Sequence, residues 1–220
     1  MFDETTLELK PTKTVVYRIV TAIITTLSWL FFRPHVSGRE NIPLQGPVLI
    51  APIHRSNVDF VFTLFISPRK VFFMAKDSLF TVPVVGRLLR HLGAFPVRRG
   101  TADRESMQIA EAVLRRGQAL VLFPEGTRKE GRHVEQLRDG AMFVAARTGA
   151  MVVPVGIGGS DRALPARRVL PRPARIRIVI GTPISPPMSE GRISRSAVAA
   201  KSEELRRELE SVYQQSLEAS

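Results

Sequence analysis

A histidine and an aspartate stand five residues apart in the segment Pro52-Ile53-His54-Arg55-Ser56-Asn57-Val58-Asp59. The apolar run 48–51 before it is typical of a short buried strand, and 60–66 after it can continue as a helix. On one continuous helix, residues five apart point about 140° away from each other, so the pair can meet only if His54 lies in the turn before the helix. With Ser56 as N-cap, Asp59 falls at the third helical position, where the helix dipole favours a carboxylate that reaches back to the imidazole.

Two interpretations of this pair follow from its chemistry. A carboxylate that holds one imidazole nitrogen leaves the other nitrogen free to take a proton from a hydroxyl, which is the arrangement of a general base. Ser56-x-x-Asp59 is also a capping box, in which Asp59 only closes a helix end. These eight residues alone favour neither interpretation.

The composition limits the classes of function. The chain has 220 residues, enough for one α/β domain, and a net charge of +12, which suits an anionic partner such as phospholipid headgroups, a phosphorylated substrate or nucleic acid. It contains no cysteine, which excludes a thiol nucleophile, a disulfide framework and a thiolate metal site. The four histidines are far apart in the sequence, so we expect no metal site.

The most apolar segment lies at 14–32, after a start that lacks the basic character of a signal peptide. Its apolar residues recur every four positions, and a polar stripe opposes them. The apolar set is Val15, Ile19, Ile23, Leu27 and Phe31, and the polar set is Thr14, Arg18, Thr21, Thr25 and Ser28. This pattern predicts an amphipathic helix that associates with a membrane, with Trp29 as an interface anchor. The alternative is that the helix packs on the protein's own core.

The remaining chain alternates between strand-like and helix-like segments. Strands are predicted at 71–75, 93–97, 119–123, 151–156 and 175–180, and helices at 103–116, at 139–148 and from Ser194 onward, with loops at 161–173 and 182–191. This order predicts a single α/β domain with a mixed sheet, largely crossover-connected and flanked by helices. We divide the chain into a membrane-associating helix (1–34), the α/β domain (35–192) and a C-terminal helix packed on it (193–220).

Charged residues follow two further predicted strands. In Phe123-Pro124-Glu125-Gly126-Thr127-Arg128, the proline ends the strand and the glycine permits a tight turn, so Glu125 and Arg128 are presented at the strand end. Arg98 and Arg99 likewise follow the strand-like run 93–97. Guanidinium groups suit phosphate because they form two parallel hydrogen bonds with it. Taken singly, each arginine is more typical of a solvated surface position, but arginines at two strand ends together with a histidine at a third favour a shared site.

Together these motifs resemble the four ordered blocks of the glycerolipid acyltransferases. The blocks are His54-x4-Asp59, the segment from Ala75-Lys76 through Gly86 to Gly93–Gly100, the Phe-Pro-Glu-Gly-Thr-Arg block, and Val153-Pro154-Val155. The resemblance covers roughly residues 35–184 and is strongest to the bacterial 1-acyl-glycerol-3-phosphate (lysophosphatidic acid) acyltransferases.

The resemblance implies transfer of an acyl chain from acyl-CoA or acyl carrier protein to the free hydroxyl of 1-acyl-glycerol-3-phosphate, giving phosphatidic acid, without a further cofactor. It implies that His54 is the general base and Asp59 its orienting carboxylate. It further implies that Arg99 and Arg128, with Lys76 as a candidate third group, hold the acceptor's phosphate. Glu125 and Gly126 would shape the glycerol pocket, and Thr127 belongs to the same substrate-binding set. It places such an enzyme at the cytoplasmic face of the cell membrane, as a peripheral or monotopic protein.

Two alternatives stay open on the sequence alone. The same chemistry can act on glycerol-3-phosphate, on another lysophospholipid or on a glycolipid. A basic protein that binds membrane or nucleic acid without catalysis also explains the charge, but the chain lacks helix-turn-helix, zinc-finger and RNA-binding sheet signatures, and we expect no nucleic-acid partner.

Overall fold

The computed structural model describes residues 14–97, 104–165, 168, 170–187 and 193–218. Its helices are α1 (Thr14–Phe32), α2 (Asp59–Thr63), α3 (Pro83–His91), α4 (Arg104–Arg115), α5 (Gly140–Thr148), α6 (Ser160–Ala163) and α7 (Arg195–Glu218), with short 3-10 turns η1 (Arg39–Asn41) and η2 (Asp77–Leu79). Its strands are β1 (His35–Ser37), β2 (Val48–Pro52), β3 (Val71–Lys76), β4 (Ala94–Val97), β5 (Ala119–Val121), β6 (Met151–Gly158) and β7 (Arg177–Ile180).

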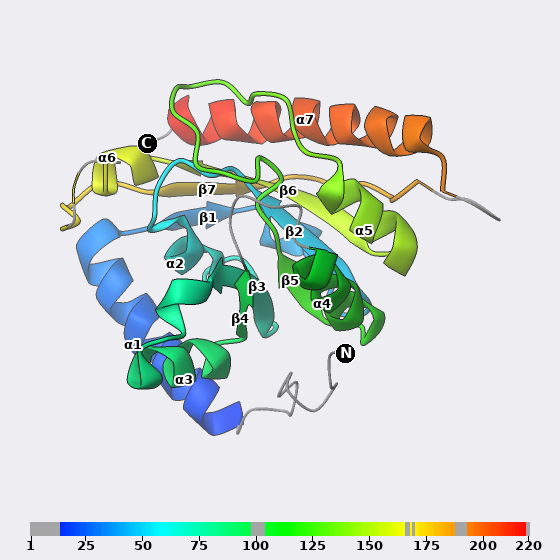
Figure 1. The fold of residues 1–220 in the computed structure, drawn as a ribbon. Helices are drawn as coiled ribbons and strands as arrows, with labels where there is room; N and C mark the ends of the chain where they lie inside the picture. Colours follow the sequence, from blue (N-terminus) through cyan, green and yellow to red (C-terminus); the bar gives the residue numbers. More distant parts are fainter. Residues whose placement is uncertain (1–13, 98–103, 166–167, 169, 188–192, 219–220) are drawn as a thin grey trace.

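The described strands form one seven-stranded sheet in the order β1-β7-β6-β2-β5-β3-β4 (Figure 1). Strands β6, β2, β5, β3 and β4 run parallel, whereas β7 pairs antiparallel with β6 and parallel with β1. The parallel strands are joined through helices, so the predicted mixed α/β sheet with crossover connections is confirmed. Parallel neighbours present their carboxyl ends at one edge of the sheet, where ligands of α/β proteins commonly bind.

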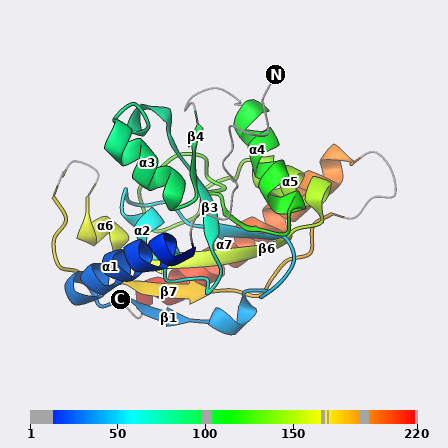
Figure 2. The same cartoon turned by 90° about the horizontal axis from the view of Figure 1, so that it is seen from below.

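Helices cover both faces of this sheet. Helix α7 lies along β6 and β7 on one face and contacts α5, while α1 and α2 lie on the other face (Figures 1 and 2). The central strand β2 is buried along its whole length, which explains its unbroken apolar sequence. Apolar residues of β2, β5 and β6 form the centre of the core.

The predicted strands and long helices fall within a few residues of the observed ones. Besides the two 3-10 turns, three elements were not predicted: the edge strand β1, helix α3 and the short helix α6. Strand β1 has only three residues, too few to be recognised by a periodic pattern, and the apolar Val84, Val85 and Leu88 of α3 are exposed and do not mark a buried face. The segment predicted as a loop from 161 begins within the short helix α6.

Helix α1 turns its polar stripe toward the protein. Thr21 and Thr25 are half-buried and Ser28 is buried, beside Tyr17, Val20, Ile24 and Phe32, which pack on the core. The threonine hydroxyls donate to backbone carbonyl oxygens one turn earlier, Thr21 to Tyr17 (2.7 Å) and Thr25 to Thr21 (2.8 Å), so they need no other partner.

The opposite face of α1 is apolar and exposed. Its large side chains keep between 42% and 66% of their surface accessible: Val15, Ile19, Ile23, Leu27, Trp29, Leu30 and Phe31. Helix α1 therefore does pack on the protein's own core, but through the opposite face, and its apolar stripe is left exposed. Among the described helices, none combines the length and the hydropathy needed to cross a bilayer.

Helix α7 approaches β6 closely because two glycines of that strand have no side chain. A Cβ atom at Gly156 would lie 2.2 Å from the carbonyl oxygen of Val212, and one at Gly158 would lie 2.2 Å from that of Ser216. The obstructing atoms belong to the helix backbone, so a rotamer change cannot relieve the clash. The spacing between helix and sheet is therefore set by these two positions.

We expect Gly156→Ala to lower the free energy of unfolding by about 2–3 kcal/mol, because α7 must move away from β6 to accommodate the methyl group. Gly140→Ala is the matched control, since the nearest atom to its Cβ is the flexible Met107 Cε at 3.3 Å. Urea unfolding measures both variants. Equal stability of the two variants would contradict the close contact.

Candidate active site

The carboxyl ends of four adjacent parallel strands, β2, β5, β3 and β4, meet at one edge of the sheet. His54 follows β2, the segment 123–128 follows β5, and Lys76 is the last residue of β3. Arg99 follows β4 in the sequence but lies outside the described residues. The structure therefore gathers at this edge the predicted site residues that it describes.

His54 and Asp59 meet in the turn between β2 and α2. The imidazole Nδ1 lies 3.0 Å from Asp59 Oδ2, and the same oxygen accepts hydrogen bonds from the backbone N–H groups of Arg55 and Ser56, both at 2.7 Å. The carboxylate can only accept, so Nδ1 carries the proton and Nε2 is left with a free lone pair. With 13% of its side chain exposed, His54 is accessible from outside while Asp59 is buried.

The expected N-cap is wrong. Helix α2 begins at Asp59 and its N-cap residue is Val58, while the Ser56 hydroxyl donates to the Leu164 carbonyl oxygen at 2.8 Å. Asp59 is thus the first helical residue and not the third. Its carboxylate still bonds the Ser56 N–H, which is one half of a capping box. The same oxygen therefore shapes the turn and holds the imidazole, so the two interpretations of this motif are compatible.

The motif after β5 holds His54 in place. Glu125 Oε2 accepts a hydrogen bond from the His54 N–H (2.8 Å), and the Lys129 N–H donates to the His54 carbonyl oxygen (2.9 Å). The Phe123 ring stacks on the imidazole, with 4.2 Å between ring centroids and 29° between planes. Both backbone groups and one ring face of the histidine are thereby fixed.

Beneath this turn, Arg55 and Glu125 form a buried ion pair that sequence reasoning missed. Arg55 Nη1 donates to both Glu125 oxygens at 2.7 and 2.9 Å, and the two side chains keep only 2% and 0% of their surface exposed. The other guanidinium nitrogens donate to the carbonyl oxygens of Gly131 (3.2 Å) and His133 (2.8 Å). No sequence signal marks this burial, because an arginine at a strand end is ordinarily solvated.

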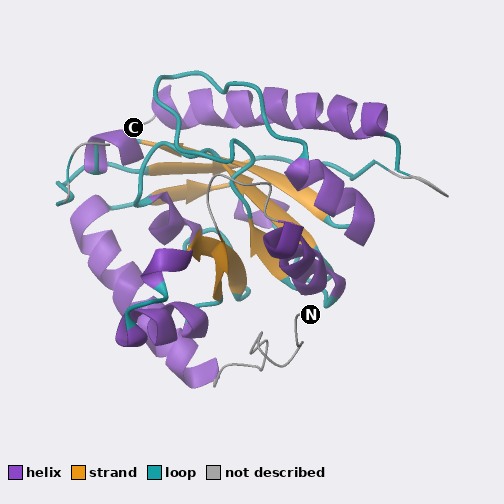
Figure 3. Ribbon diagram, in the orientation of Figure 1, coloured by secondary structure: helices purple, strands orange, loops and turns teal. Residues whose placement is uncertain are grey.

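Helix α7 completes the surroundings of Arg55 and ties down the loop between β5 and α5. The Arg55 guanidinium lies 5.1 Å from the Tyr213 ring centroid, and burial raises the pKa of the Tyr213 phenol. Gln214 donates to the Arg132 carbonyl oxygen, and Glu210 accepts from the Val134 N–H. Figure 3 shows this loop running alongside α7.

Burial of Glu210 raises the pKa of its carboxyl, but hydrogen bonds from Val134, Gln214 and His133 outweigh that effect, and the pKa lies below its ordinary value. The carboxylate that fastens the loop to α7 is therefore held in its ionised form.

The predicted substrate-binding residues differ in accessibility. Gly126, Thr127, Arg128 and Lys76 are exposed at the carboxyl edge. Glu125 is predicted to shape the acceptor pocket, but its side chain has no exposed surface and bonds to His54 and Arg55. The structure thus gives Glu125 a supporting position beneath the histidine turn. Phosphate binding by Arg128, Arg99 and Lys76 stays a prediction.

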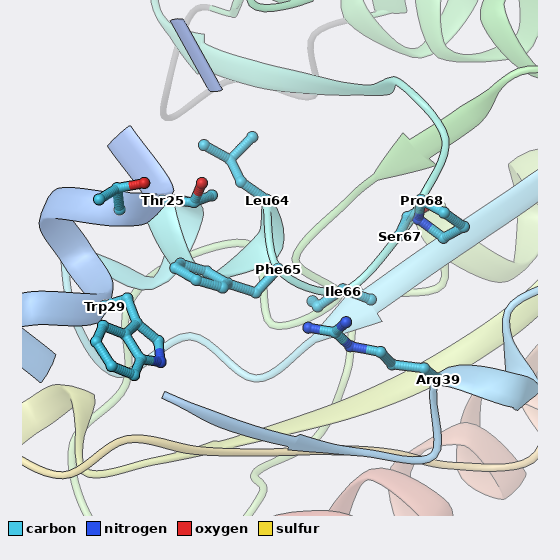
Figure 4. Close-up of a pocket in the computed structure, with 9 residues that line it drawn as sticks. Thr25, Trp29, Arg39, Leu64, Phe65, Ile66, Ser67 and Pro68 are labelled. Atoms are coloured by element: carbon cyan, nitrogen blue, oxygen red, sulfur yellow. The ribbon is translucent and has the colours of Figure 1, made fainter. Parts of the chain in front are cut away.

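A groove of about 610 Å³ lies apart from these residues, between α1 and the segment that follows α2. Its walls are largely apolar, and in Figure 4 the Arg39 guanidinium points toward the side that carries Phe65 and Trp29. None of the predicted site residues lines it. Across the described residues, no three His, Asp or Glu side chains are grouped so that they could hold a metal ion.

We expect Glu125→Ala to lower the free energy of unfolding by about 3–5 kcal/mol, because it leaves the Arg55 charge buried without a partner. The double variant Arg55→Ala/Glu125→Ala should be less destabilised than the sum of the single variants. Glu203→Ala is the matched control, since Glu203 and Arg206 form an exposed pair whose loss should leave the free energy of unfolding nearly unchanged. Strict additivity in urea unfolding would contradict a coupled pair.

Comparison with known proteins extends over most of the chain. Similar proteins include the chloroplastic 1-acyl-sn-glycerol-3-phosphate acyltransferase LPAT1 of Arabidopsis thaliana, 27% identical over 158 residues, which are 70% of this chain and 44% of the relative. The 1-acyl-sn-glycerol-3-phosphate acyltransferase of Bacillus subtilis is 30% identical over 151 residues, 68% of this chain and 72% of the relative. The chain spans about half the length of the plant and algal relatives that it matches.

A solved structure and a family model agree with these relatives. The crystal structure of the 1-acyl-sn-glycerophosphate (LPA) acyltransferase PlsC from Thermotoga maritima superposes with a TM-score of 0.74 and 25% sequence identity, covering 96% of this chain and 86% of that one. The model of the family described as Acyltransferase matches residues 33–158, which include the histidine turn and the segment after β5. Because that match covers more than half of the chain, the protein is a member of the acyltransferase family.

Proposed function

We propose that this protein transfers an acyl chain from acyl-CoA or acyl carrier protein to the free hydroxyl of 1-acyl-glycerol-3-phosphate, which yields phosphatidic acid. The observation that carries the proposal is the 3.0 Å contact between His54 Nδ1 and Asp59 Oδ2, which leaves Nε2 free on an accessible ring. The names of the plant, bacterial and structural relatives support the choice of acceptor.

In this mechanism, His54 Nε2 takes the proton of the acceptor hydroxyl as its oxygen attacks the thioester carbonyl. The resulting tetrahedral intermediate collapses, the carbon–sulfur bond breaks, and the thiolate receives the proton from the imidazolium. Asp59 stabilises the imidazolium through its hydrogen bond with Nδ1. A direct attack of this kind needs no covalent acyl-enzyme, in agreement with a chain that contains no cysteine.

The acceptor of this reaction is a membrane lipid, and the exposed face of α1 supports docking on a membrane. Helix α3, whose apolar residues Val84, Val85 and Leu88 are exposed, lies on the same side of the molecule as α1 (Figures 1 and 2). The net charge of +12 adds attraction to anionic headgroups. We propose that α1 lies in the headgroup boundary of the cytoplasmic leaflet, with its threonine face toward the protein.

We expect His54→Ala to reduce turnover by about 10²- to 10⁴-fold, the range typical of a lost general base, while the thermal unfolding temperature changes little. Release of free thiol from acyl-CoA in the presence of 1-acyl-glycerol-3-phosphate measures turnover, and glycerol-3-phosphate serves as the competing acceptor. His35→Ala, which alters an exposed histidine on β1, is the matched control and should keep wild-type turnover. Full turnover by His54→Ala would remove the assignment.

We expect the triple variant Ile19→Ser/Ile23→Ser/Leu27→Ser to lose co-sedimentation with vesicles that contain anionic phospholipid, because it removes the apolar face that would enter the bilayer surface. Its stability should hold, since all three side chains are more than half exposed. The control is Leu44→Ser/Leu170→Ser, which removes exposed leucines outside α1. Unchanged co-sedimentation of the triple variant would show that the basic surface alone provides the anchoring.

A further inference from the structure

Arg138 lies at the point where the loop after β5 returns to the end of that strand. Its backbone N–H donates to the Pro124 carbonyl oxygen at 3.0 Å, so the loop closes on itself there. Glu125, the next residue along, bonds the His54 N–H. Although Arg138 is distant in sequence from the histidine motif, its backbone is thus fixed to the same turn.

The side chain of Arg138 passes over Gly126. A Cβ atom at Gly126 would lie 2.7 Å from both Cδ and Nε of Arg138 and 3.3 Å from Cζ. Gly126 also has a φ of +71°, a conformation that favours glycine. Glycine at this position therefore permits both the tight turn and the approach of the guanidinium to it.

The charge of Arg138 is available to a ligand. The residue is exposed, and among the described residues its guanidinium has no hydrogen bond or ion pair. The contrast with Arg55 is clear, because all three nitrogens of that buried guanidinium are occupied by protein acceptors. Arg128, two residues beyond Gly126, is likewise exposed, so this turn carries a second arginine in addition to the Arg138 side chain that lies over it.

We propose that Arg138 contacts the phosphate of the acceptor and makes the site selective for phosphorylated glycerols. This inference rests on the proposed function. In 1-acyl-glycerol-3-phosphate, the carbon that bears the free hydroxyl is bonded directly to the carbon that carries the phosphate. When the hydroxyl faces His54 Nε2, the phosphate must lie close to the histidine, and the Gly126 turn stands directly beside it. A planar guanidinium there can bind two phosphate oxygens at once.

The test compares two acceptors that differ only in the phosphate, 1-acyl-glycerol-3-phosphate and 1-acyl-glycerol, with acyl-CoA as donor and the full chain in detergent micelles. We expect Arg138→Ala to lower kcat/KM for the phosphorylated acceptor tenfold or more, mainly through KM, and to change that for 1-acyl-glycerol by less than twofold. For the phosphorylated acceptor, Arg138→Lys should have a kcat/KM between those of the wild-type chain and Arg138→Ala, because lysine keeps the charge but not the forked pair of donors. Arg128→Ala is measured alongside, because Arg128 is the arginine that the sequence already predicts to bind the acceptor phosphate.

Arg116→Ala is the matched control, since Arg116 is also exposed but lies at the opposite end of β5, and it should leave both acceptors unaffected. Equal losses with both acceptors, or a selective rise in KM for acyl-CoA, would overturn the assignment to the acceptor phosphate.

A second measurement separates this inference from the proposed function. Calorimetric titration with glycerol-3-phosphate in the absence of donor should give at least a tenfold higher Kd for Arg138→Ala than for the wild-type chain. If wild-type protein releases no thiol with any acceptor, the proposed reaction is wrong, and the titration still decides the role of Arg138. Equal Kd values would refute it.

Discussion

One oxygen atom, Asp59 Oδ2, receives hydrogen bonds from the His54 ring and from two consecutive backbone N–H groups. Charge-assisted bonds of this kind are about twice as strong as neutral ones, and three of them offset the cost of burying a carboxylate. The other oxygen, Oδ1, is buried without a hydrogen-bond partner among the described atoms. All of the hydrogen bonds that the Asp59 side chain accepts from those atoms therefore go to Oδ2. The path of the chain from β2 into α2 and the orientation of the imidazole thus have the same cause.

A second layer of contacts keeps that turn in register with the rest of the edge. Arg55 and Glu125 join the ends of β2 and β5, which are neighbours in the sheet but 70 residues apart in the sequence. Desolvating two charges is costly, and this pair repays the cost only because both Glu125 oxygens and all three guanidinium nitrogens have partners. The ion pair thus forms a rigid support beneath the accessible His54, and a general base needs such a fixed position.

The sequence predicts the parts of this fold that are governed by burial. The runs at 48–51 and 151–156 are unbroken and apolar because β2 and β6 are covered on both faces, and their place in a parallel sheet follows from that. The meeting of His54 with Asp59 was predictable from spacing, but the identity of the cap was not, because Ser56 bonds Leu164, more than 100 residues away.

Long-range pairing also hides the burial of Arg55, whose partners come from three distant segments. For α1, the sequence predicts the helix from its period, but it does not predict which face of the helix contacts the protein. The usual assumption places the most apolar stripe inside, and here the hydroxyl-bearing stripe is inside because its hydroxyls are satisfied by the helix backbone.

The contacts around Arg55 also determine the stage of synthesis at which the support of the histidine turn becomes complete. Tyr213, whose ring lies against the guanidinium, is synthesised more than 150 residues after His54 and Arg55. Glu210 and Gln214, which fasten the loop carrying Gly131 and His133, arrive equally late. The full set of contacts around the buried guanidinium therefore forms only once α7 has been synthesised, so a nascent chain at an earlier stage holds its histidine without that support.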